Sequence, residues 1–578
     1  MKPTVLVLGS GPIRIGQGIE FDYSCVHCVW SLQKMGYRAI IVNNNPETVS
    51  TDFDTGDGLY FEPVTLEDTL DIIVHENPIG VVCQFGGQTA INLAEGLASH
   101  DVQVLGTSPK SIAMAEDREQ FDELLERLAI PRPRGKAVRS LDEAKVVAST
   151  VGYPVLVRPS FVLGGRAMEI VFSEKQLHGF YREAEDANPG QPVLVDKYIF
   201  GKEAEVDVIS DGVDTLVPGI MEHIERAGIH SGDSMAVYPT ISLTPSIKAQ
   251  MVTSACKIAR ALQVKGLMNI QFVVQNEVAY VLEVNPRASR TVPYLSKVTG
   301  IPMVDLATRC MMGRTLKEMG YASGLWVLRP PVRPARDGGE AACALPQFAD
   351  LFGLEVVRNP ATHAEGTILS EQSFIDGTTI IPPAVLYAIK APVFSFQKLA
   401  KVEPSLGPEM KSTGEILGID NTFEGALYKA FVASGIHFKG DGYVLLTVND
   451  DDKAAALEIA KGLYASGRQI AATHGTAKTL VDHGVPCKPV NKIQQGSPNI
   501  LDLITDGSVS LMINTPGLNE SSESEAARIR RACIESGVPC VTSIDTATAL
   551  IRALDVYANP EAASCLRLEE YFKGGAAD

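Results

Sequence analysis

One stretch decides the fold: Leu282-Glu283-Val284-Asn285-Pro286-Arg287, followed by Arg290 three residues later. It closes a β-rich passage over residues 268–274 and 278–282. Because side chains alternate along a strand, Glu283 and Asn285 emerge on one face and Val284 on the other. A carboxylate and an amide oxygen then lie side by side, with Gln271 available from the preceding strand. Such oxygen ligands suit Mg²⁺, which binds between one or two carboxylates and substrate phosphates.

Arg287 and Arg290 follow at a spacing that lets both guanidinium groups point into the same site. A metal–nucleotide site beside an anion clamp is typical of phosphoryl transfer. The alternative is a strand that simply ends at Pro286. Loop length bears on the geometry: a three-residue loop, Asn276-Glu277-Val278, would place Gln271 opposite Glu283, whereas a two-residue loop would place it opposite Leu282.

Composition bounds the class of protein. The chain has 578 residues, of which 45% are hydrophobic and 21% charged, as in an ordinary globular protein of several domains. The net charge of −18 argues against partners such as nucleic acid or an anionic membrane. We interpret Cys25-Val26-His27-Cys28 as buried free thiols rather than zinc ligands, because no second cluster completes a metal set. No signal peptide or membrane-spanning run is evident, so we expect a cytoplasmic location.

Residues 1–115 predict a small parallel α/β domain, with short apolar runs at 5–8, 39–43, 80–83 and 102–105. Its first turn runs from Gly9 to Gly18 and is only weak evidence for nucleotide binding. It is neither G-x-G-x-x-G nor a P-loop, since Gln17 stands where the P-loop lysine belongs. A second glycine turn, Gly86-Gly87-Gln88-Thr89, follows a later strand.

Residues 116–330 predict a second domain, with amphipathic helices at 120–129 and 246–262. A glycine loop, Leu163-Gly164-Gly165-Arg166, follows Arg158 and would let the backbone approach a phosphate closely. A plain hairpin is the alternative. Residues 201–207 place acidic side chains on one strand face, and His230, in the polar loop 228–234, is interpreted as structural.

Residues 331–435 predict a linker and packing region, and residues 331–380 within it have no clear period. The α/β rhythm returns over residues 436–578. There the turn Thr473-His474-Gly475-Thr476 opens a helix whose free amides could hold an anion. Lys492 and Asn514 could converge on it, because ligands bind at the carboxyl ends of parallel strands. Ordinary helix capping by Thr473 or Thr476 is the alternative.

Six segments occur in an order that resembles a known family. They are 11–23 (GPIRIGQGIEFDY), 43–52 (NNNPETVSTD), 157–166 (VRPSFVLGGR), 283–290 (EVNPRASR), 406–414 (LGPEMKSTG) and 472–476 (ATHGT). This order resembles the C-terminal, carbamate-phosphorylating half of the carbamoyl phosphate synthetase large chain. The resemblance implies a multidomain α/β fold: a pre-ATP-grasp domain at 1–115, an ATP-grasp domain at 116–330, the insertion and linker region at 331–435, and a methylglyoxal-synthase-like regulatory domain at 436–578.

The activity that the resemblance implies is ATP-dependent phosphorylation of carbamate to carbamoyl phosphate, in pyrimidine and arginine biosynthesis. Arg287 and Arg290 match the arginines that hold carbamate. The residues that match ligands of two Mg²⁺ or Mn²⁺ ions are Gln271, Glu283 and Asn285. Asn285 also matches a catalytic position. K⁺ is a further candidate cofactor. The residues that match ATP-binding positions are Arg118, Arg158, Gly164, Gly165, Lys197, Ile199, Glu203, Gly228, Ile229, His230, Ser231, Gln271 and Glu283. Carbamate is itself an oxygen nucleophile, so positioning and electrostatics suffice without a general base.

The C-terminal domain resembles an allosteric module of the same family. Six positions match those that hold a nucleotide effector: Thr447, Lys453, Thr473, Thr476, Lys492 and Asn514. Pro516 stands where a hydroxyl is common, which leaves the effector's identity open. Residues 513–519 contain no acid where the synthase has its catalytic carboxylate, so regulation is implied rather than lyase activity. Four residues would match an ornithine pocket, conditionally: Glu225, Asp233, Glu409 and Thr546.

The chain departs from the family in carrying one set of motifs where the usual large chain has two, and in lacking a glutaminase. The bicarbonate-phosphorylating half and the glutaminase are therefore expected on separate chains, or two copies of this chain associate and share the work. Two other functions stay open: a different ATP-grasp ligase that activates a small carboxylate, and a non-catalytic regulatory subunit that uses only the C-terminal domain. The complete metal set favours an enzyme.

Overall fold

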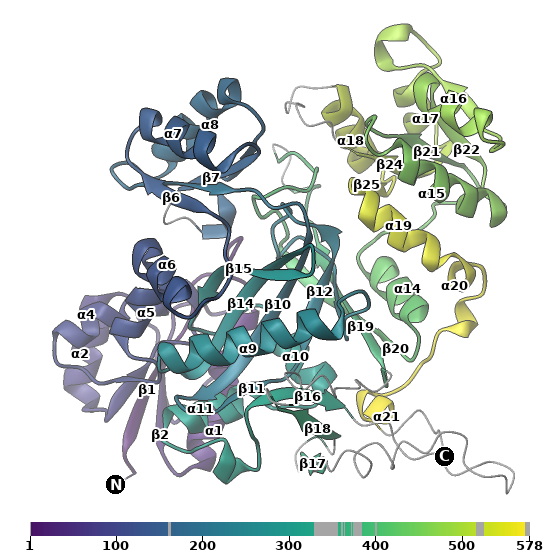
Figure 1. Cartoon of the computed structure of the whole chain (residues 1–578). Coiled ribbons are helices and arrows are strands. Elements are labelled where there is room, and N and C mark those ends of the chain that lie inside the picture. Colours follow the sequence, from purple (N-terminus) through teal and green to yellow (C-terminus); the bar gives the residue numbers. More distant parts are fainter. Residues whose placement is uncertain are drawn as a thin grey trace, which may run out of the picture.

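The structure is a computed structural model. It describes residues 2–159, 163–328, 356–359, 362, 364–370, 373, 384–398, 402–515 and 525–572. Pro516 and most of the predicted insertion at 331–380 lie outside these residues. Figure 1 shows a small α/β domain, a large sheet with a smaller sheet above it, and a further α/β domain that contains the late part of the chain.

The first domain is a five-stranded sheet in which every pairing is parallel, in the order β3-β2-β1-β4-β5. The strands are Thr4–Leu8 (β1), Arg38–Val42 (β2), Gly58–Tyr60 (β3), Gly80–Val82 (β4) and Val104–Leu105 (β5). Four were predicted from their apolar runs, which lie buried between helices as in other parallel sheets. The prediction missed β3, a three-residue edge strand whose side chains are only half-buried.

Helix α1 joins this domain to the next. Its buried residues Cys25, Val29 and Leu32 belong to one apolar cluster with Leu295 and Val298. The remaining helices of the first domain are Leu66–Glu76 (α2), Gly87–Ile91 (α3), Ala94–Ser99 (α4) and Pro109–Glu116 (α5), with α1 itself at Glu20–Lys34. The shared cluster makes the two domains one packed body.

The second domain begins with helix α6 and a four-stranded antiparallel sheet, in the order β6-β9-β7-β8. Its elements are Arg118–Arg127 (α6), Gly135–Val138 (β6), Leu141–Val151 (α7), Val155–Pro159 (β7), Glu169–Val171 (β8), Glu174–Ala187 (α8) and Val193–Lys197 (β9). Figure 1 shows α7 and α8 covering this sheet on the side away from the large sheet. The glycine loop lies between β7 and β8, so it does connect two antiparallel strands, as the hairpin alternative held.

An eleven-stranded sheet forms the body of the domain, along the path β17-β18-β16-β11-β10-β12-β13-β19-β20, with β14 paired to β10 and β15. Its strands are Lys202–Asp211 (β10), Thr215–Val217 (β11), Ile220–Arg226 (β12), Ala236–Tyr238 (β13), Lys265–Gln275 (β14), Val278–Asn285 (β15), Gly324–Leu328 (β16), Val356–Arg358 (β17), Glu365–Leu369 (β18), Tyr387–Val393 (β19) and Gly414–Asp420 (β20). The last four come from residues 331–435, the segment predicted as insertion and linker. They extend this same sheet.

Four helices pack around the large sheet: Pro245–Ala261 (α9), Val292–Thr299 (α10), Met303–Met311 (α11) and Phe423–Ala433 (α14). Helix α9 was predicted at 246–262. It begins after Thr244, whose hydroxyl accepts a hydrogen bond from the Ile247 amide at 3.4 Å, and Pro245 occupies the first turn. None of the described helices is long and apolar enough to cross a membrane.

The hairpin between β14 and β15 differs from both predicted arrangements. Gln275 faces Val278, so the loop is the two-residue turn Asn276-Glu277, whose φ angles of 50° and 58° suit a tight hairpin turn. The register nevertheless places Gln271 opposite Glu283, because it shifts between Gln271 and Phe272. Leu282 is the extra residue, a β-bulge on β15. The prediction that this register needs a three-residue loop was therefore wrong.

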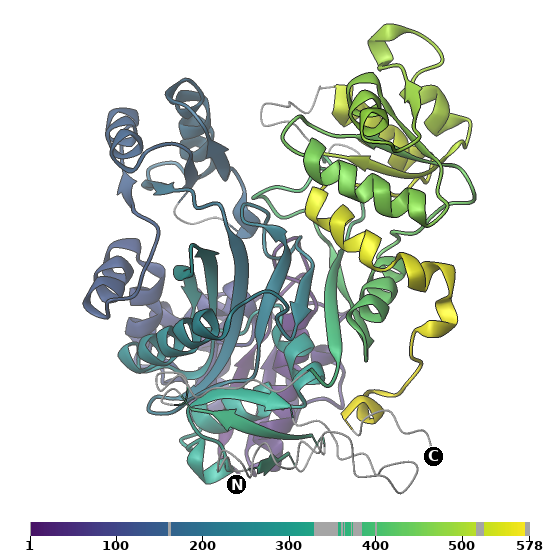
Figure 2. The same ribbon diagram turned by 45° about the vertical axis from the view of Figure 1, so that its right-hand side comes forward.

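The C-terminal domain is a second five-stranded sheet with only parallel pairings, in the order β23-β22-β21-β24-β25. Its strands are Tyr443–Thr447 (β21), Ile470–Thr473 (β22), Lys488–Val490 (β23), Val509–Asn514 (β24) and Cys540–Val541 (β25). Its helices are Lys453–Ala465 (α15), His474–Asp482 (α16), Ile500–Thr505 (α17), Glu525–Glu535 (α18), Ile544–Arg552 (α19) and Leu554–Ala558 (α20). Figure 2 shows the domain beside the edge of the large sheet that carries β19 and β20.

Candidate active site

A cavity of about 990 Å³ lies between the four-stranded sheet and the large sheet. All sixteen residues predicted for the ATP, metal and carbamate sites line it. They are Arg118, Arg158, Gly164, Gly165, Lys197, Ile199, Glu203, Gly228, Ile229, His230, Ser231, Gln271, Glu283, Asn285, Arg287 and Arg290. Residues up to 172 positions apart in the sequence, Arg118 and Arg290, thus meet in one place.

The floor of the cavity is a polar face three strands wide. Strand pairing across β10, β14 and β15 gives two rows of facing residues, Glu205–Gln271–Glu283 and Asp207–Asn269–Asn285. Facing residues of an antiparallel pair project from the same side of the sheet. Val284 lies on the other side, 4% exposed, in the core. Without the bulge at Leu282, Glu283 would oppose Ile270 and enter that core instead.

The floor fits a magnesium ion. Glu283 supplies a carboxylate that is 42% exposed to the cavity. Gln271 donates its amide nitrogen to Ser231 Oγ at 3.1 Å, so its oxygen is the atom available for a cation. Asn285 donates to Glu283 Oε1 at 3.1 Å, which holds these two side chains together. One carboxylate with amide oxygens is a donor set that leaves coordination positions for substrate phosphates, the usual state of protein-bound Mg²⁺.

Cys25 and Cys28 lie on helix α1. Among the described residues no three His, Cys, Asp or Glu side chains cluster in a way that could hold a metal ion. Cys25 and Cys28 are free and buried, and burial raises the pKa of Cys28 to about 12, so its thiol stays protonated. The interpretation of this pair as buried thiols is confirmed.

Two arginines at the side of the cavity share one carboxylate that the sequence analysis missed. Asp196, at the end of β9, accepts from Arg118 at 2.7 Å and lies 3.7 Å from an Arg158 nitrogen. Arg118 also lies 3.2 Å from Asp122. Arg158 lies 3.8 Å from Glu283, which links the side of the cavity to its floor. Asp196 is 6% exposed, and its strand-end position next to the predicted Lys197 was the available signal.

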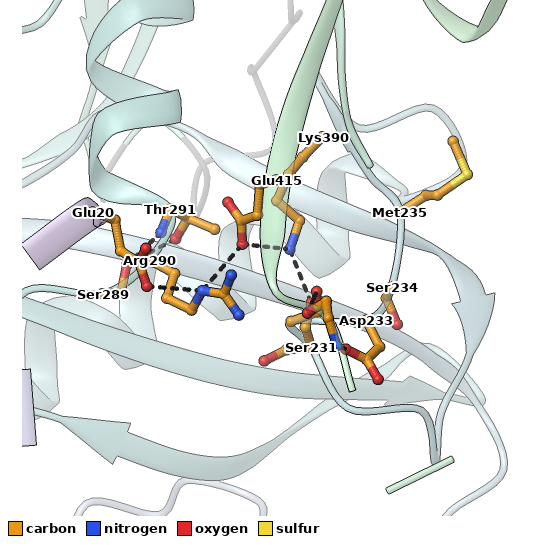
Figure 3. A network of polar contacts seen from close by, with 12 residues as sticks. Glu20, Ser231, Asp233, Ser234, Met235, Ser289, Arg290, Thr291, Lys390 and Glu415 are labelled. Carbon is orange, nitrogen blue, oxygen red and sulfur yellow. Dashed lines mark hydrogen bonds and ion pairs between the residues drawn. The ribbon is translucent and has the colours of Figure 1, made fainter. Parts of the chain in front are cut away.

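Arg287 and Arg290 approach the floor from the segment after β15. Arg287 donates to the Gln88 side chain at 3.2 Å and to Asn285 Oδ1 at 3.4 Å. Arg290 Nε lies 2.9 Å from Glu20 and 3.4 Å from Glu415. Figure 3 shows Arg290 between these two carboxylates. Burial raises the pKa of Glu415, and the positive charges beside it oppose that rise.

Lys390 completes this network and was also missed. It lies on β19, almost fully buried, and donates to the carbonyl of Ser231 at 2.9 Å (Figure 3). Glu20 lies on α1 and Glu415 on β20, so the network joins three distant parts of the chain. Lys390 and Glu415 belong to residues 331–435, which were predicted as an insertion and linker or packing region, and no local pattern marked either residue as part of a site.

Two further residues predicted for the ATP site, Lys197 and Ile199, are the candidates for an adenine pocket and line the same cavity. Lys197 Nζ donates to the carbonyls of Gly152 and Tyr153, both at 2.9 Å, so this ammonium fixes the loop before β7. Glu203 accepts from the amide of Gly228 at 3.1 Å. His230 Nδ1 accepts from the Gly232 amide at 3.1 Å, and burial lowers the pKa of its imidazole. These bonds agree with a structural role for the His230 ring.

A buried histidine on β12 lies beside the acidic residues of the floor, on the same face of the sheet as Glu205. His223 Nε2 lies 3.4 Å from Glu205, and Nδ1 lies 3.5 Å from Glu203. Burial alone would lower the pKa of His223, but the hydrogen bonds and charges of the two carboxylates outweigh it and raise this pKa to about 9. The imidazolium therefore balances the acidic row at neutral pH.

The glycine turns of the first domain contact each other rather than forming a phosphate loop. Gln17 donates to the carbonyl of Ser10 at 2.7 Å and to Thr89 Oγ1 at 2.8 Å. The side chain at the position of a P-loop lysine thus ties the first turn to the second. Gly16 and Gln88 line the cavity beside Arg287, so this edge of the first domain closes one side of the site.

The predicted effector residues lie at or after the carboxyl ends of strands in the C-terminal sheet. Thr447 and Asn514 face each other in the register of β21 and β24, and the Asn514 amide donates to Thr447 Oγ1 at 2.5 Å. Thr473 ends β22 and makes no side-chain capping bond to α16, so capping does not explain it. The other three follow β21, β22 and β23 in turn: Lys453, Thr476 and Lys492.

The four residues of the conditional ornithine pocket lie at the boundary with the C-terminal domain. Glu225 accepts from the Thr546 hydroxyl at 2.6 Å and from the Met235 amide at 2.7 Å. Asp233 accepts from the backbone amides of Lys411 and Ser412, both at 2.8 Å, next to Glu409. The ornithine assignment stays a prediction.

Three models of protein families match the chain in order. The carbamoyl phosphate synthase preATP-grasp domain matches residues 1–114, the carbamoyl-phosphate synthase L chain ATP binding domain matches residues 117–319, and an MGS-like domain matches residues 455–542. With the two sheets and the cavity between them, these matches define an ATP-grasp protein and indicate an ATP-dependent ligase that activates a carboxylate. Together they support a carbamoyl phosphate synthase-like large chain. The predicted fold class is confirmed.

Several solved biotin carboxylases resemble the chain. The biotin carboxylase domain of Hydrogenobacter thermophilus 2-oxoglutarate carboxylase, solved with MgADP, ADP and bicarbonate, is 19% identical, with 65% of this chain and 89% of that chain covered and a TM-score of 0.45. Campylobacter jejuni biotin carboxylase in complex with an ATP ligand is 16% identical, with coverages of 64% and 87% and a TM-score of 0.46. These identities are too low to transfer a substrate or a residue's role to this chain.

Replacing Asp196 tests whether it aligns the two arginines. We expect Asp196→Asn to weaken MgATP binding about ten-fold, because the amide keeps the shape but loses the charge that holds Arg118 and Arg158. Isothermal titration with MgATP measures this. Asp186→Asn, the same change at an exposed position of α8, is the control and should bind like the wild type. Equal affinity of Asp196→Asn and the control would show that Asp196 does not position the arginines.

The raised pKa of His223 predicts a pH-dependent stability. Its protonated form is favoured in the folded state, so its contribution is complete below the unfolded pKa near 6.5 and is lost as pH rises through about 9. His223→Gln should therefore lower the thermal midpoint by about 3 °C at low pH and by much less above pH 9. His178→Gln, at an exposed site, is the control. If the thermal midpoint of His223→Gln lies below that of the wild type by the same amount across this pH range, His223 is not charged in the folded protein.

Proposed function

We propose that the chain phosphorylates carbamate with ATP to give carbamoyl phosphate, as the C-terminal half of a split large subunit. One observation carries the proposal: the oxygen ligands Glu283 and Asn285, at the end of β15, and the cations Arg287 and Arg290, on the segment that follows it, lie in the same cavity. A small anion bound by the two arginines would lie next to phosphates bound above Glu283. The class of ATP-dependent ligase agrees with this chemistry.

In the proposed reaction a carbamate oxygen forms a bond to the γ-phosphorus of ATP, and the bond from that phosphorus to the β,γ-bridging oxygen breaks. The products are carbamoyl phosphate and ADP. Arg287 and Arg290 orient the carbamate, while Arg118 and Arg158 bind phosphate oxygens. Glu283, Asn285 and Gln271 would hold Mg²⁺, which offsets phosphate charge when bound. No proton has to be removed from the nucleophile, so no general base is required.

Carbamate must reach this site from elsewhere. We propose that the bicarbonate-phosphorylating half and the glutaminase reside on separate chains, or that two copies of this chain share the two phosphorylations. Either arrangement would serve pyrimidine and arginine biosynthesis in the cytoplasm. The C-terminal domain would bind a small anionic effector at Thr447, Lys453 and Asn514, together with Thr473, Thr476 and Lys492.

The reverse half-reaction tests the proposal without any partner chain. The purified chain should make ATP from ADP and carbamoyl phosphate in the presence of Mg²⁺, measured by a luciferase assay. Acetyl phosphate in place of carbamoyl phosphate separates this function from a ligase of another small carboxylate. No ATP above background with carbamoyl phosphate would reject the proposal.

Glu283→Gln is the matched active-site variant. It keeps the size of the side chain and its bond with Asn285 but removes the carboxylate charge, so we expect the partial reaction to fall by at least about 100-fold. Circular dichroism and thermal unfolding should match those of the wild type. Wild-type turnover in this variant would show that Glu283 does not hold the metal.

A further inference from the structure

Residues 402–412, here called the strap, contact both the C-terminal domain and the cavity. They precede β20 and belong to the region predicted as linker. We propose that the strap couples the candidate effector pocket to the phosphate-binding glycine loop. Arg530 is the positioning residue at the end of the strap that contacts the C-terminal domain. The inference rests on the proposed nucleotide site but not on carbamate as the substrate.

The end of the strap at the cavity is bound by backbone hydrogen bonds. The Met410 amide donates to the carbonyl of Gly164 at 2.8 Å, and the His230 amide donates to the carbonyl of Gly407 at 2.8 Å. A Cβ at Gly165, whose φ is +68°, would lie 2.4 Å from the Pro408 carbonyl, so strap and loop are in direct contact. The position of the glycine loop is therefore set in part by the strap.

The strap also contacts the arginine predicted to hold carbamate. Arg290 Nη1 donates to Met410 Sδ at 3.3 Å. The amides of Lys411 and Ser412 both donate to the Asp233 carboxylate, which fixes this part of the strap to the loop after β12. A movement of the strap would thus reach both the ATP end and the anion end of the cavity.

The other end of the strap is held by helix α18. Arg530 Nε lies 2.6 Å from Glu403, and Arg530 Nη1 donates to Asn514 Oδ1 at 2.7 Å. The neighbouring Arg531 donates to the carbonyl of Val402 at 2.8 Å. The Arg530 side chain is 1% exposed. A guanidinium buried this deeply depends on its partners, because losing one leaves a poorly compensated charge.

Asn514 connects this ion pair to the candidate effector pocket. Its amide nitrogen binds Thr447 Oγ1 while its oxygen binds Arg530, so one planar group bridges pocket and helix. A ligand that engages Thr447 and Asn514 must reorient or polarise that amide. Glu403 and Gly407 are four residues apart, at most about 14 Å of extended chain. The route from the pocket to the cavity is therefore short and runs through described contacts at every step.

Glu403→Gln tests the coupling in the full-length protein. We expect it to weaken MgATP binding about five-fold, as measured by isothermal titration, a typical coupling between sites. Hydrogen exchange should increase at the Met410 amide, which donates to the Gly164 carbonyl, and at the His230 amide, which donates to the Gly407 carbonyl. Arg530→Lys, which keeps the charge but cannot reach both partners, should act in the same direction. Glu458→Gln removes a surface partner of Lys461 and is the control for charge change.

Asn514→Asp mimics an anion in the pocket. Its carboxylate should draw Arg530 away from Glu403, so we expect the same weaker MgATP binding and faster exchange. Added to Glu403→Gln, it should have no further effect, because both changes act on one element. Additive effects of the two substitutions would overturn the proposal.

Other outcomes are also decisive. Wild-type affinity and wild-type exchange in Glu403→Gln would overturn the coupling while leaving the proposed function intact. Weaker binding without faster exchange in the strap would mean that the effect travels by another route, and would overturn it too. If the wild type failed to bind MgATP, the proposed function would fall, and the exchange measurements alone would then decide whether the strap holds the glycine loop.

Discussion

The antiparallel register between β14 and β15 is the constraint on which the candidate site depends. A tight turn at Asn276-Glu277 would by itself send Glu283 into the core, and the bulge at Leu282 reverses that outcome. One unpaired residue therefore decides that Glu283 and Asn285 face the cavity and Val284 faces the core. Strand β10 then adds Glu205 and Asp207 to the same face, which makes a polar floor out of a buried sheet.

This floor concentrates negative charge, and basic side chains around the cavity supply the compensating positive charge. Arg118 on α6 and Arg158 on β7 both pair with Asp196 on β9, and Arg290, on the segment after β15, pairs with Glu20 on α1. His223 lies beside the floor as an imidazolium between two glutamates. The arrangement keeps positive charge fixed near the places where phosphate and a small anion are proposed to bind. Such fixed charges need little reorganisation when a substrate arrives.

The sequence predicted the residues that line the cavity better than the tertiary contacts that hold them. Every predicted ATP, metal and carbamate residue lines one cavity, because local motifs such as residues 283–290 and 157–166 specify them. Asp196, Lys390 and Glu415 were missed, since each acts through tertiary pairing that no local spacing reveals. The bulge was missed for a similar reason: alternation predicts faces only within an uninterrupted strand. Strands β19 and β20 were missed as part of the large sheet, because β19 joins it by pairing with the distant β13 and β20 joins it only through β19.

The most direct test of the account is a crystal structure of the full chain with ADP and Mn²⁺, in which anomalous scattering locates the metal. The account predicts a metal peak within about 2.3 Å of a Glu283 carboxylate oxygen, next to the diphosphate, with the adenine near Lys197 and Ile199. A nucleotide bound elsewhere, or a metal held at the diphosphate without Glu283, would contradict the claim that the β14–β15 register builds the site.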